Sequence, residues 1–160
     1  MRIGIGYDIH PLAPGRPLIL GGVEIEHEKG LLGHSDADVL IHSICDALLG
    51  AAGMGDIGVH FPSGDDTYKD EPSTNFLRTV VALLRRPGRE IENIDSVVIA
   101  QEPQLSPFFD RMKETIAAAA NIPVDKINIK GKSPEGIGPV GKGEAIASYS
   151  VALLTDLPER

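Results

Sequence analysis

The segment from Asp38 to Leu49, DVLIHSICDALL, predicts a helix that is apolar on almost every side. It has strong helix formers and no glycine or proline, and we expect it to stop at Gly50. A helix that is hydrophobic all round is a buried helix, which limits the folds open to the chain. Asp38, His42 and Asp46 lie four positions apart, so they form one polar stripe that should face inward and find partners there.

The amino-terminal quarter is predicted to be β structure. MRIGIGYDI reads as an apolar strand that should be buried, and PLILGGVEIE as a hairpin that turns at Gly21-Gly22. Side chains two apart on a strand point to the same face, so Asp8 and His10 converge. They are the expected partners of the polar stripe on the helix.

The rest of the chain alternates helix and strand. Residues 61–74 form a long polar segment without periodicity, which is typical of a lid or a disordered segment. Residues 144–154 fit either a helix or a strand. This order predicts an α+β fold: a two-layer α/β sandwich, with a mixed sheet and helices on one face, formed as a single domain by residues 1–160. We expect helices at 75–86 and 107–120, ending near residues 121–123, and strands at 94–101 and 126–132.

Charge and cysteine content restrict the partners and the compartment. The net charge is −8 and no window is strongly basic, so nucleic acid and anionic membranes are not expected partners. Cys45 is the single cysteine, which fits a reducing compartment. Without a leader or an apolar run of about 18 residues, the sequence is interpreted as cytoplasmic.

Asp8, His10 and His42 together suggest a metal site. Two imidazoles and a carboxylate are a common ligand set for zinc, with the fourth position open for water or substrate. The alternative is that His42 is an ordinary core histidine and Asp8 a hydrogen-bonding residue at a strand end. The joint occurrence of the three residues favours the metal.

The motif GHSDAD precedes the helix. Ser35 or Asp36 is expected to cap the helix, but capping does not explain His34. A His-Ser pair at a helix amino terminus suggests a phosphate or carboxylate ligand.

A second glycine-rich region covers residues 130–144. Gly136, Gly141 and Lys142 fit G-x-x-x-x-G-K, but Gly143 follows where a P-loop needs Ser or Thr, so the P-loop interpretation is rejected. A solvated turn is the simplest alternative. The remaining polar residues could hold phosphate oxygens and a magnesium ion: Lys130, Lys132, Ser133 and Glu135.

Four separated motifs, in order, resemble the 2-C-methyl-D-erythritol 2,4-cyclodiphosphate synthase family: GYDIH, GHSDADVLIHSICDALLGAAGMGDIGVHFP, IAQEPQLSPF and INIKGKSPEGIGPVGKGEAIA. The resemblance covers nearly the whole chain. It implies a lyase of the non-mevalonate isoprenoid pathway, which converts 4-diphosphocytidyl-2-C-methyl-D-erythritol 2-phosphate into the cyclodiphosphate and CMP.

The resemblance also implies roles for individual residues. Asp8, His10 and His42 would bind Zn²⁺ or another divalent transition metal, and Glu135 would bind Mg²⁺ or Mn²⁺ between the α and β phosphates. His34 and Ser133 would stabilise the transition state. The implied substrate contacts are Asp8, His10, His34, Ser35, Asp56, Ile57, Gly58, Phe61, Pro62, Ser63, Gly64, Asp65 and Lys142, with a cytidine pocket of Ala100, Gln101, Glu102, Pro103, Gln104, Leu105, Ser106, Lys132, Ser133, Pro134 and Glu135.

The family forms homotrimers with active sites between subunits. Typical members carry Phe and Arg where this chain has Pro139 and Lys142, so an apolar cavity on the trimer axis is not implied for this chain. Lysine keeps the charge of arginine but not its planar fork. Asp46 is a candidate acceptor that fixes the tautomer of His42, or else an ordinary polar residue of the helix stripe.

Two other functions fit the same residues. A zinc-dependent phosphohydrolase would use the same three ligands with an activated water. A non-catalytic nucleotide-binding trimer with structural zinc is less well supported, because structural zinc usually has four protein ligands.

Overall fold

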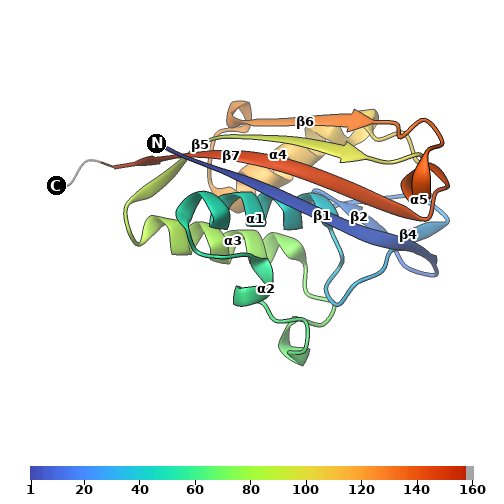
Figure 1. The fold of residues 1–160 in the computed structure, drawn as a ribbon, viewed down its shortest axis with the longest axis horizontal. Helices are drawn as coiled ribbons and strands as arrows, with labels where there is room; N and C mark the ends of the chain where they lie inside the picture. The colour runs from blue at the N-terminus through green and yellow to red at the C-terminus, as the bar shows by residue number, and fades with distance from the viewer. Residues whose placement is uncertain (158–160) are drawn as a thin grey trace.

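The computed structural model describes residues 1–157 of the chain, and within them the main sheet has five strands in the order β4-β1-β7-β5-β6. β5 and β6 run parallel, and the other neighbouring pairs are antiparallel. Three long helices lie on one face of this sheet (Figure 1). The predicted mixed sheet with helices on one face is confirmed. The strands are β1 (Arg2–Pro14), β4 (Lys29–Leu31), β5 (Arg89–Ile99), β6 (Ile127–Lys132) and β7 (Ala145–Asp156), and the helices are α1 (Val39–Ala52), α3 (Ser73–Arg85) and α4 (Phe109–Ala120).

Helix α1 is the centre of the core. It packs against β1 and β7 on one side and against α3 on the other, and nearly all of its residues are buried, as its sequence predicts. The predicted end at Gly50 is wrong, because the helix continues to Ala52. The chain leaves the helix at Gly53, whose φ of 69° allows the left-handed cap that glycine favours.

The outer face of β1 is not buried, contrary to expectation. Ile3 is 73% exposed and Ile5 is 69% exposed, because no element of residues 1–157 covers this side of the sheet. Tyr7 stacks beside Tyr149 of β7, with ring centroids 4.6 Å apart. Exposed apolar side chains therefore gather on this face of the sheet. Its exposed residues are Ile3, Ile5, Tyr7, Ile9, Tyr149 and Val151.

The ambiguous segment 144–154 is a strand, β7. It lies between β1 and β5 and pairs antiparallel with both, so tertiary pairing decides a conformation that small residues such as AIASYS leave open. The predicted hairpin is also present, formed by β2 (Leu18–Leu20) and β3 (Val23–Ile25) around Gly21-Gly22.

Short elements were missed. They are β4, the one-turn helices α2 (Ile57–His60) and α5 (Gly138–Gly141), and 3-10 turns at Asp66–Tyr68, Ser106–Phe108 and Val124–Lys126. The predicted helices at 75–86 and 107–120 correspond to α3 and α4, and α4 ends at Ala120 with Asn121 as its cap, close to the predicted end. None of the helices in residues 1–157 has the length and apolarity needed to cross a bilayer.

Candidate active site

Glycines on β1 bring α1 close to the sheet. Gly4 and Gly6 face the helix, and a β-carbon on Gly6 would lie 1.9 Å from the backbone oxygen of Ser43. Any larger side chain would push the helix away from the strand. Since side chains alternate along a strand, Asp8 points to the same face as the glycines and reaches His42 on α1.

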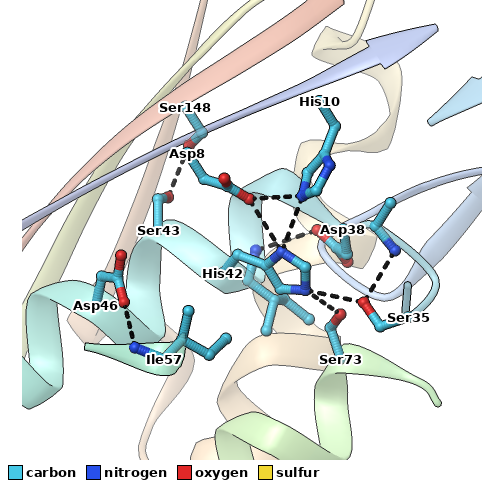
Figure 2. A network of polar contacts seen from close by, with 12 residues as sticks. Asp8, His10, Ser35, Asp38, His42, Ser43, Asp46, Ile57, Ser73 and Ser148 are labelled. Carbon is cyan, nitrogen blue, oxygen red and sulfur yellow. Dashed lines mark hydrogen bonds and ion pairs between the residues drawn. The ribbon is translucent and has the colours of Figure 1, made fainter. Parts of the chain in front are cut away.

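The predicted cluster of Asp8, His10 and His42 is present (Figure 2). Oδ2 of Asp8 lies 2.9 Å from Nδ1 of His42 and 3.0 Å from Nε2 of His10. The two ring nitrogens are 3.3 Å apart. The strand and the helix therefore place three possible ligand atoms around one point.

The ring orientation of His10 follows from its outer contact. Its Nδ1 lies 3.0 Å from the carbonyl oxygen of Leu32. A carbonyl oxygen can only accept, so Nδ1 carries the ring hydrogen and Nε2 of the neutral ring presents a lone pair to Asp8. A lone pair and a carboxylate that face each other need a cation between them.

The pKa values show the same attraction for positive charge. Burial would raise the pKa of Asp8, but the close approach of the His10 and His42 rings outweighs it and holds that pKa well below its usual range. Burial would lower the pKa of His10, but the Asp8 carboxylate reverses the effect and raises it. Both shifts favour a positive charge beside the Asp8 carboxylate.

The cluster fits a metal ion. Donor atoms that bind one tetrahedral ion at about 2.0–2.1 Å are separated by about 3.3 Å. The three donor atoms of the cluster are separated by 2.9, 3.0 and 3.3 Å. Asp8, His10 and His42 could therefore hold a divalent transition metal and leave a fourth position open.

Asp38 does not join this cluster, so the prediction that the whole stripe meets the strand is wrong. Its buried carboxylate caps α1 through Ile41 N and also accepts hydrogen bonds of 3.0 Å from Gly21 N and 2.6 Å from Gly22 N. The helix cap is therefore Asp38 rather than Ser35 or Asp36. Burial, with the nearby charge of Asp36, raises the pKa of Asp38 to about 6.

Asp46 does not orient His42, so of the two interpretations left open for this residue, the one that fixes the His42 tautomer is wrong. Its Oδ1 accepts a 2.7 Å hydrogen bond from Ile57 N, which ties α2 to α1. Nε2 of His42 instead lies 2.9 Å from Oγ of Ser73 and 3.2 Å from Oγ of Ser35 (Figure 2). Sequence reasoning missed Ser73, because nothing in its local sequence connects it with a histidine 31 positions away.

A cavity of about 420 Å³ opens beside the cluster. Its lining includes most of the residues that the family resemblance implies as substrate contacts in the motifs GHS and GDIG and at residues 61–65. Asp56 and Asp65 are absent from its lining: Asp56 caps α2, and Asp65 caps the 3-10 turn after it. Tyr68 and Phe76 were not anticipated. The lining residues are Asp8, His10, His34, Ser35, His42, Ile57, Gly58, Phe61, Pro62, Ser63, Gly64, Tyr68 and Phe76.

His34 and the aromatic residues tie the loop after α2 to this cavity. Nε2 of His34 lies 2.9 Å from the backbone oxygen of Asp65. Phe61 stacks on Phe76 with ring centroids 4.5 Å apart, and Tyr68 meets Phe76 edge-on. The segment 61–74 is thus anchored by aromatic rings, which its polar composition does not indicate.

A second cavity, of about 660 Å³, lies at the carboxyl ends of β5 and β6. It contains all of Ala100–Ser106 together with Lys132 and Ser133, as predicted for one pocket. The predicted residues Pro134 and Glu135 are not in its lining, and His27 was missed. The full lining is His27, Val98, Ala100, Gln101, Glu102, Pro103, Gln104, Leu105, Ser106, Phe109, Gly131, Lys132 and Ser133.

Two lysines of the glycine-rich region lie elsewhere. Lys130 pairs with Asp95 on the neighbouring strand at 2.5 Å, so it is not the free phosphate ligand that composition suggested. Lys142 lines a separate hollow of about 220 Å³ that also includes His27 and Gln101. Glu135 is exposed, and its backbone N–H donates to Oγ of Ser133 at 3.0 Å.

Comparison with known proteins identifies the family. A sequence model described as the YgbB family matches residues 1–155. The chain belongs to the YgbB family. Its YgbB relatives include the 2-C-methyl-D-erythritol 2,4-cyclodiphosphate synthase of Pelotomaculum thermopropionicum, which is 55% identical over 154 residues and matches 96% of this chain and 95% of the relative.

Solved structures of relatives have the same fold. The bifunctional IspDF of Campylobacter jejuni superposes with a TM-score of 0.94 at 40% identity and covers 98% of this chain, although this chain spans only 42% of that larger protein. IspF of Plasmodium falciparum, in a CDP complex, superposes with a TM-score of 0.85 at 38% identity, covering 97% of this chain and 96% of the other.

Proposed function

We propose that this chain is a lyase that converts 4-diphosphocytidyl-2-C-methyl-D-erythritol 2-phosphate into 2-C-methyl-D-erythritol 2,4-cyclodiphosphate and CMP, a step of non-mevalonate isoprenoid biosynthesis. The observation that carries the proposal is the cluster of Asp8, His10 and His42 at the edge of a 420 Å³ cavity. The names of the relatives support the same reaction.

The reaction needs no nucleophile from the protein. An oxygen of the substrate 2-phosphate attacks the β phosphorus and forms a new P–O bond, while the bond from that phosphorus to the oxygen of CMP breaks and CMP leaves with the electron pair. The protein has to hold two anionic groups together against their repulsion. That is work for cations and hydrogen-bond donors.

Asp8, His10 and His42 would hold Zn²⁺, which would supply positive charge to the substrate phosphates. Glu135 would hold Mg²⁺ together with the diphosphate, since magnesium often binds through one protein carboxylate and substrate phosphates. The exposure of Glu135 is in line with a ligand shared with substrate.

His34, Ser35 and Ser133 supply donors for the phosphates. Oγ of Ser35 accepts a hydrogen bond from Ala37 N at 3.2 Å and lies 3.2 Å from Nε2 of His42. When this hydroxyl does not donate to His42, its hydrogen can be donated to a phosphate oxygen in the cavity. His34 and Ser133 stabilise the charge that develops in the transition state.

The cytidine group would occupy the 660 Å³ cavity lined by Ala100–Ser106. The relative from Plasmodium falciparum binds CDP, which supports a cytidine nucleotide as ligand. Lys132–Glu135 and Lys142 complete the contacts to the nucleotide and its phosphates.

The protein is proposed to work as a homotrimer in the cytoplasm, with residues 1–160 as one domain. The apolar outer face of β1 and β7 suits burial between copies of the chain. Among the described residues the two cavities share no lining residue, in line with one active site that takes its metal from one chain and its cytidine pocket from the next. The buried thiol of Cys45 fits a reducing compartment.

The decisive experiment supplies the purified protein with the cytidyl substrate, zinc and magnesium, and identifies products by phosphorus NMR. We expect the cyclic diphosphate and CMP in equal amounts, and no oxygen from ¹⁸O-labelled water in the product. A linear phosphate product that carries the label would instead identify a phosphohydrolase.

A further inference from the structure

The outer nitrogen of His42 meets a buried polar chain that begins on another helix. Oγ of Ser73, the first residue of α3, lies 2.9 Å from Nε2 of His42. The same hydroxyl donates to the Asp36 carboxylate, and Ser73 N donates to that carboxylate at 2.9 Å. Ser73 is fully buried. The three side chains thus form a line from a carboxylate to the metal cluster.

The donors and acceptors in this line can be assigned. A carboxylate can only accept hydrogen bonds, so the hydroxyl hydrogen of Ser73 belongs to its bond with Asp36. Oγ of Ser73 then has only lone pairs left for His42. Nε2 of His42 must therefore carry the ring hydrogen, and Nδ1 of the neutral ring is left bare toward Asp8.

Ser35 cannot impose this orientation by itself. Its Oγ is also near Nε2 of His42, at 3.2 Å, but its other assigned contact is with a backbone donor, Ala37 N. Within residues 1–157 no carboxylate holds its hydroxyl hydrogen, so that hydroxyl can rotate and either donate to His42 or accept from it. Only the bond of Ser73 to Asp36 fixes the direction.

We propose that Ser73 is a positioning residue which, with Asp36, fixes the ring hydrogen of His42 on Nε2 and so presents Nδ1 to the metal. The inference rests on the metal centre of the proposed function, and it names two residues that raise the affinity of this centre for its metal. Partners that hold the far nitrogen of a metal-bound histidine are worth roughly 10- to 100-fold in metal affinity.

The same contacts connect the metal centre with the loop that borders the cavity. Ser73 follows residues 61–72 directly, Asp36 N donates to the backbone oxygen of Glu71 at 3.2 Å, and Asp70 N donates to that of His34 at 2.9 Å. The end of the loop and the orientation of His42 therefore depend on one set of hydrogen bonds.

Ser73→Ala tests the role, and Ser43→Ala is the matched control. Ser43 is also fully buried and follows His42 on α1, but its hydroxyl binds Ser148 and Ser150. In competition with a chelator, we expect Ser73→Ala to bind zinc roughly 10- to 100-fold more weakly. Ser43→Ala should lower the melting temperature and leave zinc affinity within twofold of the unmodified protein.

The proton itself gives a second measurement. In the zinc-loaded protein, the hydrogen on Nε2 of His42 should give a downfield proton resonance that is protected from exchange with water. It should move upfield or exchange rapidly in Ser73→Ala and remain unchanged in Ser43→Ala. Zinc affinity and a His42 resonance that both stay unchanged in Ser73→Ala would overturn the proposal.

Asp36→Asn covers the case in which Ser73→Ala does not fold. An amide can donate to Ser73 as well as accept from it, so the Ser73 hydroxyl hydrogen is no longer held in one direction. Zinc should again bind more weakly. If both single variants fold, the double variant should bind zinc no more weakly than either single variant, since both substitutions break the same row of hydrogen bonds. Additive losses of zinc affinity in the double variant would contradict the proposal that Asp36 and Ser73 act on His42 through one row of hydrogen bonds. Failure of the unmodified protein to bind zinc would instead reject the metal centre of the proposed function, and with it the positioning role of Ser73.

Discussion

The carboxylate of Asp8 and the imidazole of His42 meet across 34 positions of the sequence, with Oδ2 2.9 Å from Nδ1. We expect His42→Ala to lose most bound zinc while the protein stays folded, since one of three ligands goes but the apolar surface of α1 remains. Metal analysis after gel filtration measures the zinc content. His60→Ala is the control, because His60 binds the backbone oxygen of Met54 and lies outside the cluster. Full zinc content in His42→Ala would contradict the assignment.

The approach of β1 to α1 gives a second prediction. Gly6→Ala would place a methyl group 1.9 Å from the backbone oxygen of Ser43, so strand and helix must separate. We expect a loss of at least about 2 kcal/mol of unfolding free energy and weaker zinc binding. Denaturant unfolding and chelator competition measure the two effects.

Gly50→Ala is the control for this substitution. Gly50 lies within α1, and a β-carbon there would meet Ile5 O only at 3.7 Å, an ordinary contact. Alanine in a helix interior should raise the unfolding free energy by about 0.5–1 kcal/mol and leave zinc binding unchanged. Equal behaviour of the two variants would show that close packing of β1 on α1 does not set the metal site.

The sequence predicts the parts of this protein that depend on local pattern. The apolar surface of DVLIHSICDALL is enough to make α1 a buried helix, and the alternation along β1 is enough to place Asp8 and His10 on one face. The glycines at positions 4 and 6, on the same face as Asp8, were the overlooked signal that a helix packs directly on that strand.

Features set by distant contacts could not be predicted in this way. Asp38 binds the Gly21-Gly22 turn, Asp46 binds Ile57, and Ser73 reaches His42 only because α3 packs on α1. Each bond joins a side chain to an element that the four-residue spacing along α1 does not reveal. The burial of β1 was misjudged for a related reason, since the local alternation of its residues cannot show that no element of residues 1–157 packs on its outer face.

Asp38 provides a prediction of pH dependence. Its pKa is raised to about 6, chiefly by burial and the charge of Asp36, although three backbone N–H bonds oppose the rise. An acid that binds its proton more tightly when folded adds stability below the unfolded pKa and loses it as pH rises through the folded value. The window is therefore about pH 4 to 6.

Asp38→Asn removes this titration. We expect the unfolding free energy of the variant, relative to that of the unmodified protein, to increase by up to about 3 kcal/mol between pH 4 and pH 7. Urea unfolding across this range measures the difference. A difference that does not change with pH would mean that the Asp38 carboxyl has its ordinary pKa.

The segment of residues 62–72 is expected to respond to substrate. It lies between Phe61, which stacks on Phe76, and Ser73, and most of its residues are exposed, although Tyr68 also packs against Phe76. Hydrogen exchange should be fast without ligand and slower with the cytidyl substrate bound. Equal protection in both states would count against a lid.

Subunit mixing tests whether the site is shared. His42→Ala removes a metal ligand, and Ala100→Trp blocks the 660 Å³ cavity that Ala100 lines. Each variant should be inactive alone. Co-refolded mixtures should recover activity, because some interfaces join an intact metal cluster from one chain to an intact cytidine cavity from another. Mixtures that remain inactive after confirmed subunit exchange would indicate that the metal cluster and the cytidine cavity of one active site belong to the same chain.

The two faces of β1 have a consequence for how the sheet forms. A one-residue slip against β7 would turn Ile5 and Tyr7 toward α1, where the backbone of Ser43 leaves room only for glycine, and would turn Asp8 out among apolar side chains. A slipped sheet could not accept its central helix, so it would gain little burial and separate again. Errors in strand pairing are therefore reversible until the correct register lets the helix dock.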